Sequence, residues 1–278
     1  MIMAEIFKTV LMLSALGSGL ILLLWLIKPL TMKHFPAVWH SVIWLCIALL
    51  MLLPLWKMIP RQKAQNLTPY IASQQVEAEQ NSFEDIFVPD QTIQETYDLA
   101  PVESEKIPWI DIFSKIWLGG FLVWIASVLA SYCIFLFRKR KNSLSLLENS
   151  ALESVKKELH IKRKIRLRID HSTDSPMLVG YFFPVIYLPD RKFDPEKEKM
   201  VFRHELTHYK RGDLYFKWLA ALVNAIHWFN PFAYLLSAGV SQSCEVACDM
   251  AVSRNLKPDE QKLYMNTILD LIEKKGRK

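Results

Sequence analysis

Cysteine is scarce in this sequence. The chain of 278 residues contains four cysteines, and no two of them form a CxxC pair. Cys46 and Cys133 lie inside long apolar runs, whereas Cys244 and Cys248 are four residues apart. This spacing argues against a structural disulfide framework. It is typical of a protein whose cysteines stay reduced.

Charge is missing from three long stretches, Thr9–Ile27, Ala37–Trp56 and Ile116–Phe137. About 20 apolar residues in a helix cross the hydrocarbon layer of a bilayer. We therefore predict three transmembrane helices, two in residues 1–56 and one in residues 109–137. The first apolar run is longer than that of a typical signal peptide and a second follows almost at once, which favours an uncleaved anchor.

Basic residues mark one end of these spans. Lys28 and Lys33 lie in the short loop between the first two spans, and the run Arg138–Lys141 follows the third. Lysine and arginine are enriched in the cytoplasmic loops of membrane proteins. This pattern predicts a multi-pass protein with its N-terminus outside the cell and residues 138–278 in the cytoplasm.

The segment between the second and third spans is acidic. Lys57–Ile107 carries four basic and nine acidic residues, as expected of an outer loop. We predict residues 57–108 to be this extracytoplasmic loop, where a ligand or a sensor partner would act. The net charge of +6 then reflects membrane topology. Direct binding of nucleic acid is not expected, because basic and aromatic residues do not alternate on one face.

The sequence contains one HExxH motif, formed by His204, Glu205 and His208. Residues four apart on a helix leave the same face about one turn apart, so both imidazoles reach a single metal ion. In metalloproteases with this motif the glutamate takes a proton from the attacking water. The motif therefore predicts zinc as cofactor and Glu205 as the general base.

Local signals at both ends enclose the motif in a helix. Asp194 suits an N-cap, Pro195 suits the first helical position, and Gly212 suits a left-handed stop. We predict a helix over Pro195–Arg211.

A catalytic zinc site usually has three protein ligands, so one ligand must come from elsewhere. The downstream candidates are Asp213, His227, Cys244, Glu245, Cys248 and Asp249. A continuous helix over the apolar Leu214–Val240 would be about 40 Å long and would carry Glu245 away from the histidines. The Asn230-Pro231 pair disfavours such a helix. We predict a membrane-associated helical hairpin over residues 214–243 that brings the chain back.

On the returning helix, Glu245 and Asp249 share one face. We predict Glu245 as the third zinc ligand and Asp249 as a hydrogen-bond partner of a ligand histidine, a common arrangement at zinc sites. Cys244 and Cys248 lie on the neighbouring stripe. They are interpreted as buried packing residues, although a thiolate also binds zinc well.

The segment between the third span and the motif helix predicts a small α+β unit. Asn142–His160 has a helical pattern, and Lys164–Ile169, Met177–Val179 and Val185–Leu188 are predicted strands. We predict Val185, Ile186, Tyr187 and Leu188 to form an edge strand that binds an extended peptide substrate by strand addition. Strands that only cover the core are an equally good reading. Pro258–Lys275 is a predicted amphipathic helix.

Three motifs in order carry a family resemblance. They are His204–His208 with Arg211 and Asp213, then His227–Pro231, then Glu245–Asp249. Together they resemble the BlaR/MecR-type membrane metallopeptidases, bacterial antirepressors of β-lactam resistance. The resemblance implies a gluzincin fold and one zinc ion held by His204, His208 and Glu245. It also implies cleavage of a cytoplasmic transcriptional repressor, of the protein itself, or of both.

Well-known members of that family continue into another span and a penicillin-binding sensor, neither of which this sequence contains. We therefore expect the signal to enter through the outer loop or a partner, unless the sequence is a piece of a longer chain. A homodimer is compatible with this organisation. The pair of motifs is also similar to the housekeeping membrane proteases of the Ste24/HtpX type. A non-catalytic transducer with a structural metal site is the third reading.

Overall fold

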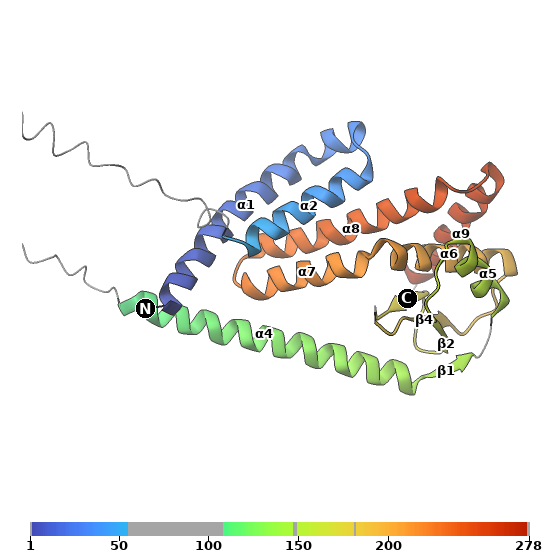
Figure 1. The fold of residues 1–278 in the computed structure, drawn as a ribbon, viewed down its shortest axis with the longest axis horizontal. Coiled ribbons are helices and arrows are strands. Elements are labelled where there is room, and N and C mark those ends of the chain that lie inside the picture. Colours follow the sequence, from blue (N-terminus) through green and yellow to red (C-terminus); the bar gives the residue numbers. More distant parts are fainter. Residues whose placement is uncertain (1, 55–107, 147–148, 181, 277–278) are drawn as a thin grey trace, which may run out of the picture. The chain divides into compact units, whose positions relative to one another are not determined.

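The computed structural model describes residues 2–54, 108–146, 149–180 and 182–276. Within these ranges the chain is mainly helical, with one four-stranded sheet (Figure 1). Most of the predicted acidic loop, residues 57–108, lies outside the described residues. The elements are α1 Ile2–His34, α2 Ala37–Leu52, α4 Pro108–Lys141, β1 Ser143–Leu146, α5 Ser150–Glu158, β2 Arg166–Asp170, β3 Met177–Val179, β4 Val185–Pro189, α6 Pro195–Arg211, α7 Asp213–Ile226, α8 Pro231–Ser253 and α9 Pro258–Gly276.

The three uncharged stretches lie on helices α1, α2 and α4. Among the described residues, Ile2–Thr31 and Trp109–Lys141 are long and apolar enough to cross a membrane, and Val38–Leu52 is an apolar helix of shorter length. Many large apolar side chains on α1 and α4 are exposed, including Leu26 at 72% and Val123 at 70%. Such surfaces suit contact with lipid.

The predicted break at Asn230-Pro231 is confirmed. Helix α7 ends at Ile226 and α8 begins at Pro231, and the two pack side by side in opposite directions (Figure 1). The side chain of Asn230 accepts a hydrogen bond from the N–H of Phe232 at 2.9 Å and donates one to Ser14 Oγ of α1 at 2.7 Å. The turn is therefore capped locally and attached to the first helix.

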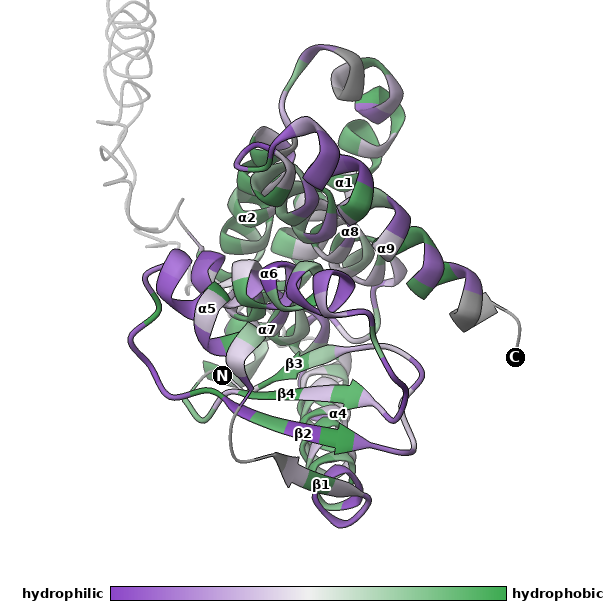
Figure 2. Ribbon diagram, turned by 90° about the vertical axis from the view of Figure 1, so that its right-hand side faces the viewer, coloured by the Kyte–Doolittle hydropathy of each residue, from purple (hydrophilic) through white to green (hydrophobic). Residues whose placement is uncertain are grey.

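An apolar core holds this hairpin against the N-terminal helices. Ile21 of α1, Trp44 and Met51 of α2, Val223 of α7 and Leu236 of α8 are all buried in it. Figure 2 shows hydrophobic residues concentrated on these helices, whereas α5 and α6 carry many hydrophilic residues. Helix α8 therefore runs from an apolar bundle into the more polar part of the chain.

The strands form a sheet in the order β1-β2-β4-β3. Strand β4 lies between β2, to which it is parallel, and β3, to which it is antiparallel. The prediction that Val185, Ile186, Tyr187 and Leu188 form an edge strand is therefore wrong. Both sides of β4 are already paired, and its uninterrupted apolar run is typical of an inner strand. The edge beside α6 is β3, which contacts that helix.

The predicted helix over Asn142–His160 is also partly wrong. Ser143–Leu146 is strand β1, antiparallel to β2, and the helix is confined to Ser150–Glu158. The alternating Ser-Leu-Ser-Leu residues have the two-residue period of a strand. Asn149 then starts the helix, because its side chain accepts a hydrogen bond from the N–H of Leu152 at 3.0 Å.

Helix α6 lies between two cores. On one side Phe202 and Leu206 pack with α5 and the sheet. On another side Met200 packs with Val252 of α8 and Tyr264 of α9. The motif helix is therefore in contact with the sheet, α8 and α9 together.

Candidate metal centre

The helix that carries the motif has the predicted bounds, Pro195–Arg211. The side chain of Asp194 accepts a hydrogen bond from the N–H of Glu196 at 3.1 Å. Gly212 ends the helix in the left-handed region, with φ of 72°, a conformation that glycine adopts without steric cost. Local capping therefore sets the position of the motif.

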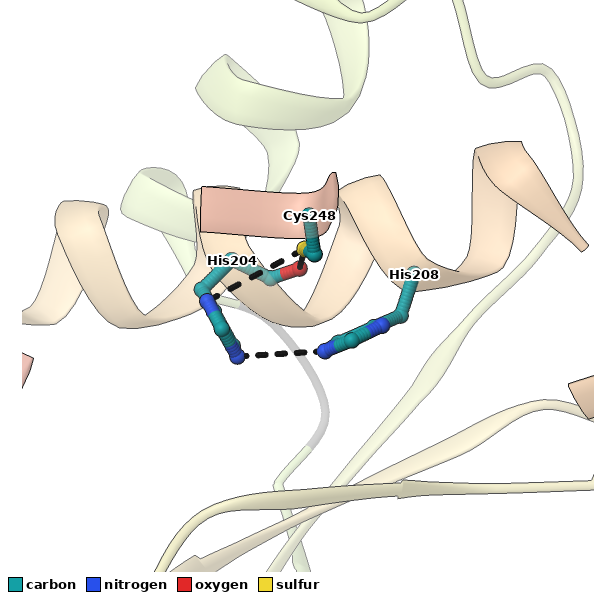
Figure 3. A group of neighbouring side chains, drawn as sticks. All are labelled: His204, His208 and Cys248. Carbon is teal, nitrogen blue, oxygen red and sulfur yellow. Dashed lines mark hydrogen bonds between the residues drawn. The ribbon is translucent and has the colours of Figure 1, made fainter. Parts of the chain in front are cut away.

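His204 and His208 point their Nε2 atoms at one another, 3.1 Å apart (Figure 3). Their rings are nearly perpendicular, with an interplanar angle of 86°. Two nitrogen ligands of a tetrahedral zinc ion are roughly 3.3 Å apart, since each lies about 2.0–2.1 Å from the metal. The two imidazoles are thus spaced as ligands of one metal ion.

Glu245 of α8 comes to the same point. Its Oε2 lies 3.2 Å from Nε2 of His208 and 3.8 Å from Nε2 of His204. The three atoms form a triangle with sides that suit three ligands of one ion. The predicted return of the hairpin therefore brings Glu245 beside the histidines, and the same oxygen-and-nitrogen donor set fits zinc.

Cys248 also lies within reach of the histidines, and His204, His208 and Cys248 form a group of possible metal ligands in the described chain. Its sulfur, however, lies 3.9 Å from Nδ1 of His204, the ring nitrogen opposite to Nε2 (Figure 3). It also donates a hydrogen bond to the backbone carbonyl of His204 at 3.5 Å. The contact of the sulfur with His204 is thus made at Nδ1, whereas the carboxylate of Glu245 approaches Nε2 of both histidines. The geometry favours Glu245 as the third ligand.

Each histidine has an acidic partner behind it. Asp213, only 2% exposed, has Oδ2 at 2.7 Å from Nδ1 of His208. Asp249, predicted to contact a ligand histidine, has Oδ1 at 3.3 Å from Nδ1 of His204. A carboxylate on the second ring nitrogen fixes the orientation of a ligand histidine and makes it more basic.

Two features of this arrangement do not follow from the sequence pattern. The sequence presents Asp213 only as a candidate third ligand, whereas its position just beyond the Gly212 cap places it beside the last turn of α6. Tyr264 of α9 belongs to none of the sequence motifs, yet its hydroxyl lies 2.7 Å from Nδ1 of His204. Nothing near Tyr264 in the sequence marks it, because it lies 60 residues from the histidine.

The side chain of Glu205 faces the β3 edge. It is partly buried, and burial raises the pKa of its carboxyl group, with the two histidines opposing this change. The backbone N–H of Leu178 in β3 hydrogen-bonds the carboxylate. The glutamate of the motif is thus held between the histidines and the edge strand.

A cleft of about 470 Å³ opens over these residues. Its floor includes His204, Glu205 and Glu245. Strand β3 lines the cleft through Met177 and Leu178, and α9 lines it through Ile268, Leu271 and Ile272. The cleft is therefore bounded by an edge strand and an amphipathic helix.

Comparison with known families gives a match over nearly the whole chain. Residues 8–278 match the family described as BlaR1 peptidase M56. The chain belongs to this family. The resemblance seen in the sequence is confirmed.

Two relatives in this family are named as regulatory proteins. The chain is 30% identical to "Regulatory protein BlaR1" of Bacillus licheniformis over 183 residues, which are 63% of this chain and 30% of the relative. It is 24% identical to "Regulatory protein BlaR1" of Staphylococcus aureus over 144 residues, which are 50% of this chain and 25% of the relative. The similarity thus spans under a third of the length of either relative.

The electrostatics of the site suit the metal that a metallopeptidase family implies. Burial lowers the pKa of His204, but hydrogen bonds to Asp249 and Cys248 outweigh it and raise the pKa to about 10. For His208, burial is outweighed by hydrogen bonds to Asp213, Cys248 and Glu245, and the pKa is about 12. A hydrogen bond to His208 lowers the pKa of Glu245 to about 2. The surrounding acidic groups therefore favour positive charge at the two imidazoles, which a divalent cation would supply in place of protons.

Proposed function

We propose that this protein is a membrane-embedded zinc metalloendopeptidase that takes part in signal transduction. Its substrate is a peptide bond in a cytoplasmic regulator, in the protein itself, or in both. The observation that carries the proposal is the approach of Nε2 of His204, Nε2 of His208 and Oε2 of Glu245 within 3.1–3.8 Å of one another. These atoms lie beside Glu205 in an open cleft.

In this proposal His204, His208 and Glu245 hold one zinc ion per chain, and Asp213 and Asp249 orient the two imidazoles. When bound, zinc supplies Lewis acidity toward a substrate carbonyl and a water molecule. The half-exposed Glu245 carboxylate, with 48% of its side chain accessible, leaves the cleft side of the ligand set open. A catalytic zinc site needs such an open position, whereas a structural site is closed.

Glu205 acts as the general base. Burial raises the pKa of its carboxyl group, which makes it a better proton acceptor than an exposed glutamate at neutral pH. It takes a proton from the attacking water at a carboxylate oxygen and passes it to the leaving amine. The backbone N–H of Leu178 acts against burial and stabilises the carboxylate form of Glu205.

The substrate lies along β3. This strand is the edge of the sheet beside the site, and it lines the cleft. An extended peptide that pairs with a strand edge presents its backbone rather than its side chains. A scissile bond is thereby placed over the histidines. In this respect β3 takes the role that the sequence suggested for Val185–Leu188.

The chain spans the membrane with its peptidase site on the cytoplasmic face. The apolar α1 and α4 support membrane insertion, and the basic end of α4, Arg138–Lys141, supports a cytoplasmic position for residues 142–278. The relatives are named as regulatory proteins, which supports a regulatory substrate. The regulator that we propose as substrate is a cytoplasmic transcriptional repressor.

Replacing Glu205 by glutamine tests this function. We expect Glu205→Gln to abolish cleavage and to retain about one zinc per chain, because it removes the proton acceptor and none of the proposed ligands. Cleavage is measured by comparing new protein N-termini in cells that produce the parent or the variant, and zinc by atomic absorption. Glu196→Gln is the matched control, since Glu196 is an exposed residue of the same helix.

Each outcome separates one function from another. Loss of one or a few N-termini supports a dedicated regulator as substrate, whereas loss of many points to a housekeeping protease. Cleavage that persists in Glu205→Gln contradicts the mechanism. If the parent binds zinc tightly but no cleaved N-terminus depends on its presence, the metal site is structural and the protein is a non-catalytic transducer.

A further inference from the structure

Three polar groups meet behind His204. The hydroxyl of Tyr264 lies 2.7 Å from Nδ1 of His204 and 2.6 Å from Oδ1 of Asp249. The direct distance between Nδ1 of His204 and Oδ1 of Asp249 is longer, 3.3 Å. The phenol therefore makes the shorter contact with both groups, and it is 2% exposed.

The hydrogen bonds of this group have one consistent direction. An ionised carboxylate only accepts hydrogen bonds, so Tyr264 donates its single O–H to Asp249. The phenol oxygen then accepts from Nδ1–H of His204. With its proton on Nδ1, a neutral imidazole has its lone pair on Nε2, and this is the nitrogen that faces His208 and Glu245.

The two histidines differ in where their support comes from. Asp213, the partner of His208, lies five residues further along the chain and is present as soon as α6 and α7 join. The support of His204 needs Asp249 of α8 and Tyr264 of α9. Helix α9 is attached to α6 by the ion pair of Lys197 and Asp270, 2.6 Å apart.

We propose that Tyr264 is a positioning residue that holds His204 in its metal-binding orientation through an imidazole–phenol–carboxylate chain, and that metal affinity consequently depends on the docking of α9. This inference rests on the metal centre of the proposed function. It adds that the helix forming one wall of the cleft also controls the strength of the site. Displacement of α9 therefore has two effects: it removes part of the cleft lining, and it weakens metal binding.

The first test measures zinc affinity by competition with a chromophoric chelator. We expect Tyr264→Phe to bind zinc 10–100-fold more weakly than the parent, the loss that accompanies removal of a group supporting a metal ligand. Tyr234→Phe is the matched control, because it also removes one tyrosine hydrogen bond, to the carbonyl of Trp228, and lies away from the site. It should stay within about 2-fold of the parent.

A double-mutant cycle separates the chain of hydrogen bonds from a loss of folding. Asp249→Asn should weaken zinc binding. In the Asp249→Asn background, Tyr264→Phe should reduce zinc affinity by less than it does in the parent, because both changes break the same chain of hydrogen bonds. Equal zinc affinity in Tyr264→Phe and the parent would overturn the positioning role while leaving the peptidase proposal intact. A parent that binds no zinc instead removes the metal centre on which both proposals rest.

The second test compares amide hydrogen exchange in the parent and in Tyr264→Phe, with and without zinc. Suppose that docking of α9 raises the affinity for zinc by some factor. Zinc binding must then raise the docking equilibrium constant of α9 by the same factor. Zinc should therefore slow amide exchange across Pro258–Gly276 in the parent, and much less in Tyr264→Phe. If zinc does not change the amide exchange rate of α9 in the parent, zinc binding and α9 docking are not coupled.

Discussion

Protons and a metal ion compete for the two imidazoles of the motif. Their acidic partners raise the pKa of both His204 and His208, which favours protonated imidazoles when no cation is bound. A metal ligand must be deprotonated. The same carboxylates that orient the rings thus also set the pH dependence of the site.

Zinc binding should release protons. Because the acidic partners favour protonated imidazoles in the metal-free protein, we expect zinc binding at pH 7 to release at least about one proton per zinc. Zinc affinity should rise as pH increases toward the pKa values of the histidines and fall in acid. Calorimetric titration in buffers with different ionisation enthalpies measures the number released. A heat of binding that does not change with the buffer would contradict this prediction.

Glu245 and Cys248 give opposite predictions as ligands. Glu245→Ala should weaken zinc binding by more than about 100-fold, since it removes an inner ligand rather than a supporting group. Cys248→Ala should retain zinc and lose about 1 kcal/mol of stability, because its buried sulfur fills space between α6 and α8. Zinc content and thermal unfolding of both variants decide between them. Loss of zinc in Cys248→Ala would make the thiol the ligand.

Among the elements, α8 has the most demanding position. It must pack against α2 in the apolar bundle and still place Glu245 beside α6. Gly239 permits this close approach, since a Cβ atom there would lie 2.5 Å from Cε2 of Trp44. The ring is rigid and buried, so it has little room to move.

A methyl group at this contact should disturb the whole hairpin. We expect Gly239→Ala to destabilise the protein by about 1–3 kcal/mol, the usual cost of overpacking, and to weaken zinc binding because α8 shifts. Gly119→Ala on α4 is the matched control, since nothing lies within 4 Å of the added atom. Thermal unfolding in detergent compares the two. If both variants unfold alike, the contact between α2 and α8 does not limit the position of Glu245.

At the scale of the whole molecule, the peptidase site and the apolar helices are parts of one structure. Residues 1–53 and 110–278 form one compact unit, in which α8 connects the bundle of α1 and α2 to the metal centre. A change in the packing of the bundle therefore has a direct mechanical route to Glu245. This is the physical basis on which a membrane signal would reach the site.

The proposed topology has a direct test in cells. A cysteine placed at Ser82, in the acidic segment, should react with a membrane-impermeant maleimide in intact cells. A cysteine at the exposed Lys162 should react only after lysis, because it follows the basic end of α4. The parent with its four native cysteines gives the background. The reverse pattern would place the peptidase site outside the cytoplasm.

Much of this architecture was predictable because it depends on neighbours in the sequence. The bounds of α6 follow from Asp194, Pro195 and Gly212, and the hairpin follows from Asn230-Pro231. The shared face of His204 and His208 follows from helical periodicity. The approach of Glu245 could be predicted because the break left the chain only one direction in which to return.

Tertiary structure decided the features that depend on distant pairing. Val185–Leu188 is equally apolar at an edge or inside a sheet, and only the arrival of β2 and β3 on its two sides made it an inner strand. Tyr264 reaches His204 because α9 packs against α6, a contact that no local pattern specifies. The sequence by itself thus determined which residues have metal-binding chemistry and which helix holds two of them. The assignment of the supporting partners came from packing, because hydrogen bonds between remote elements exist only once those elements have met.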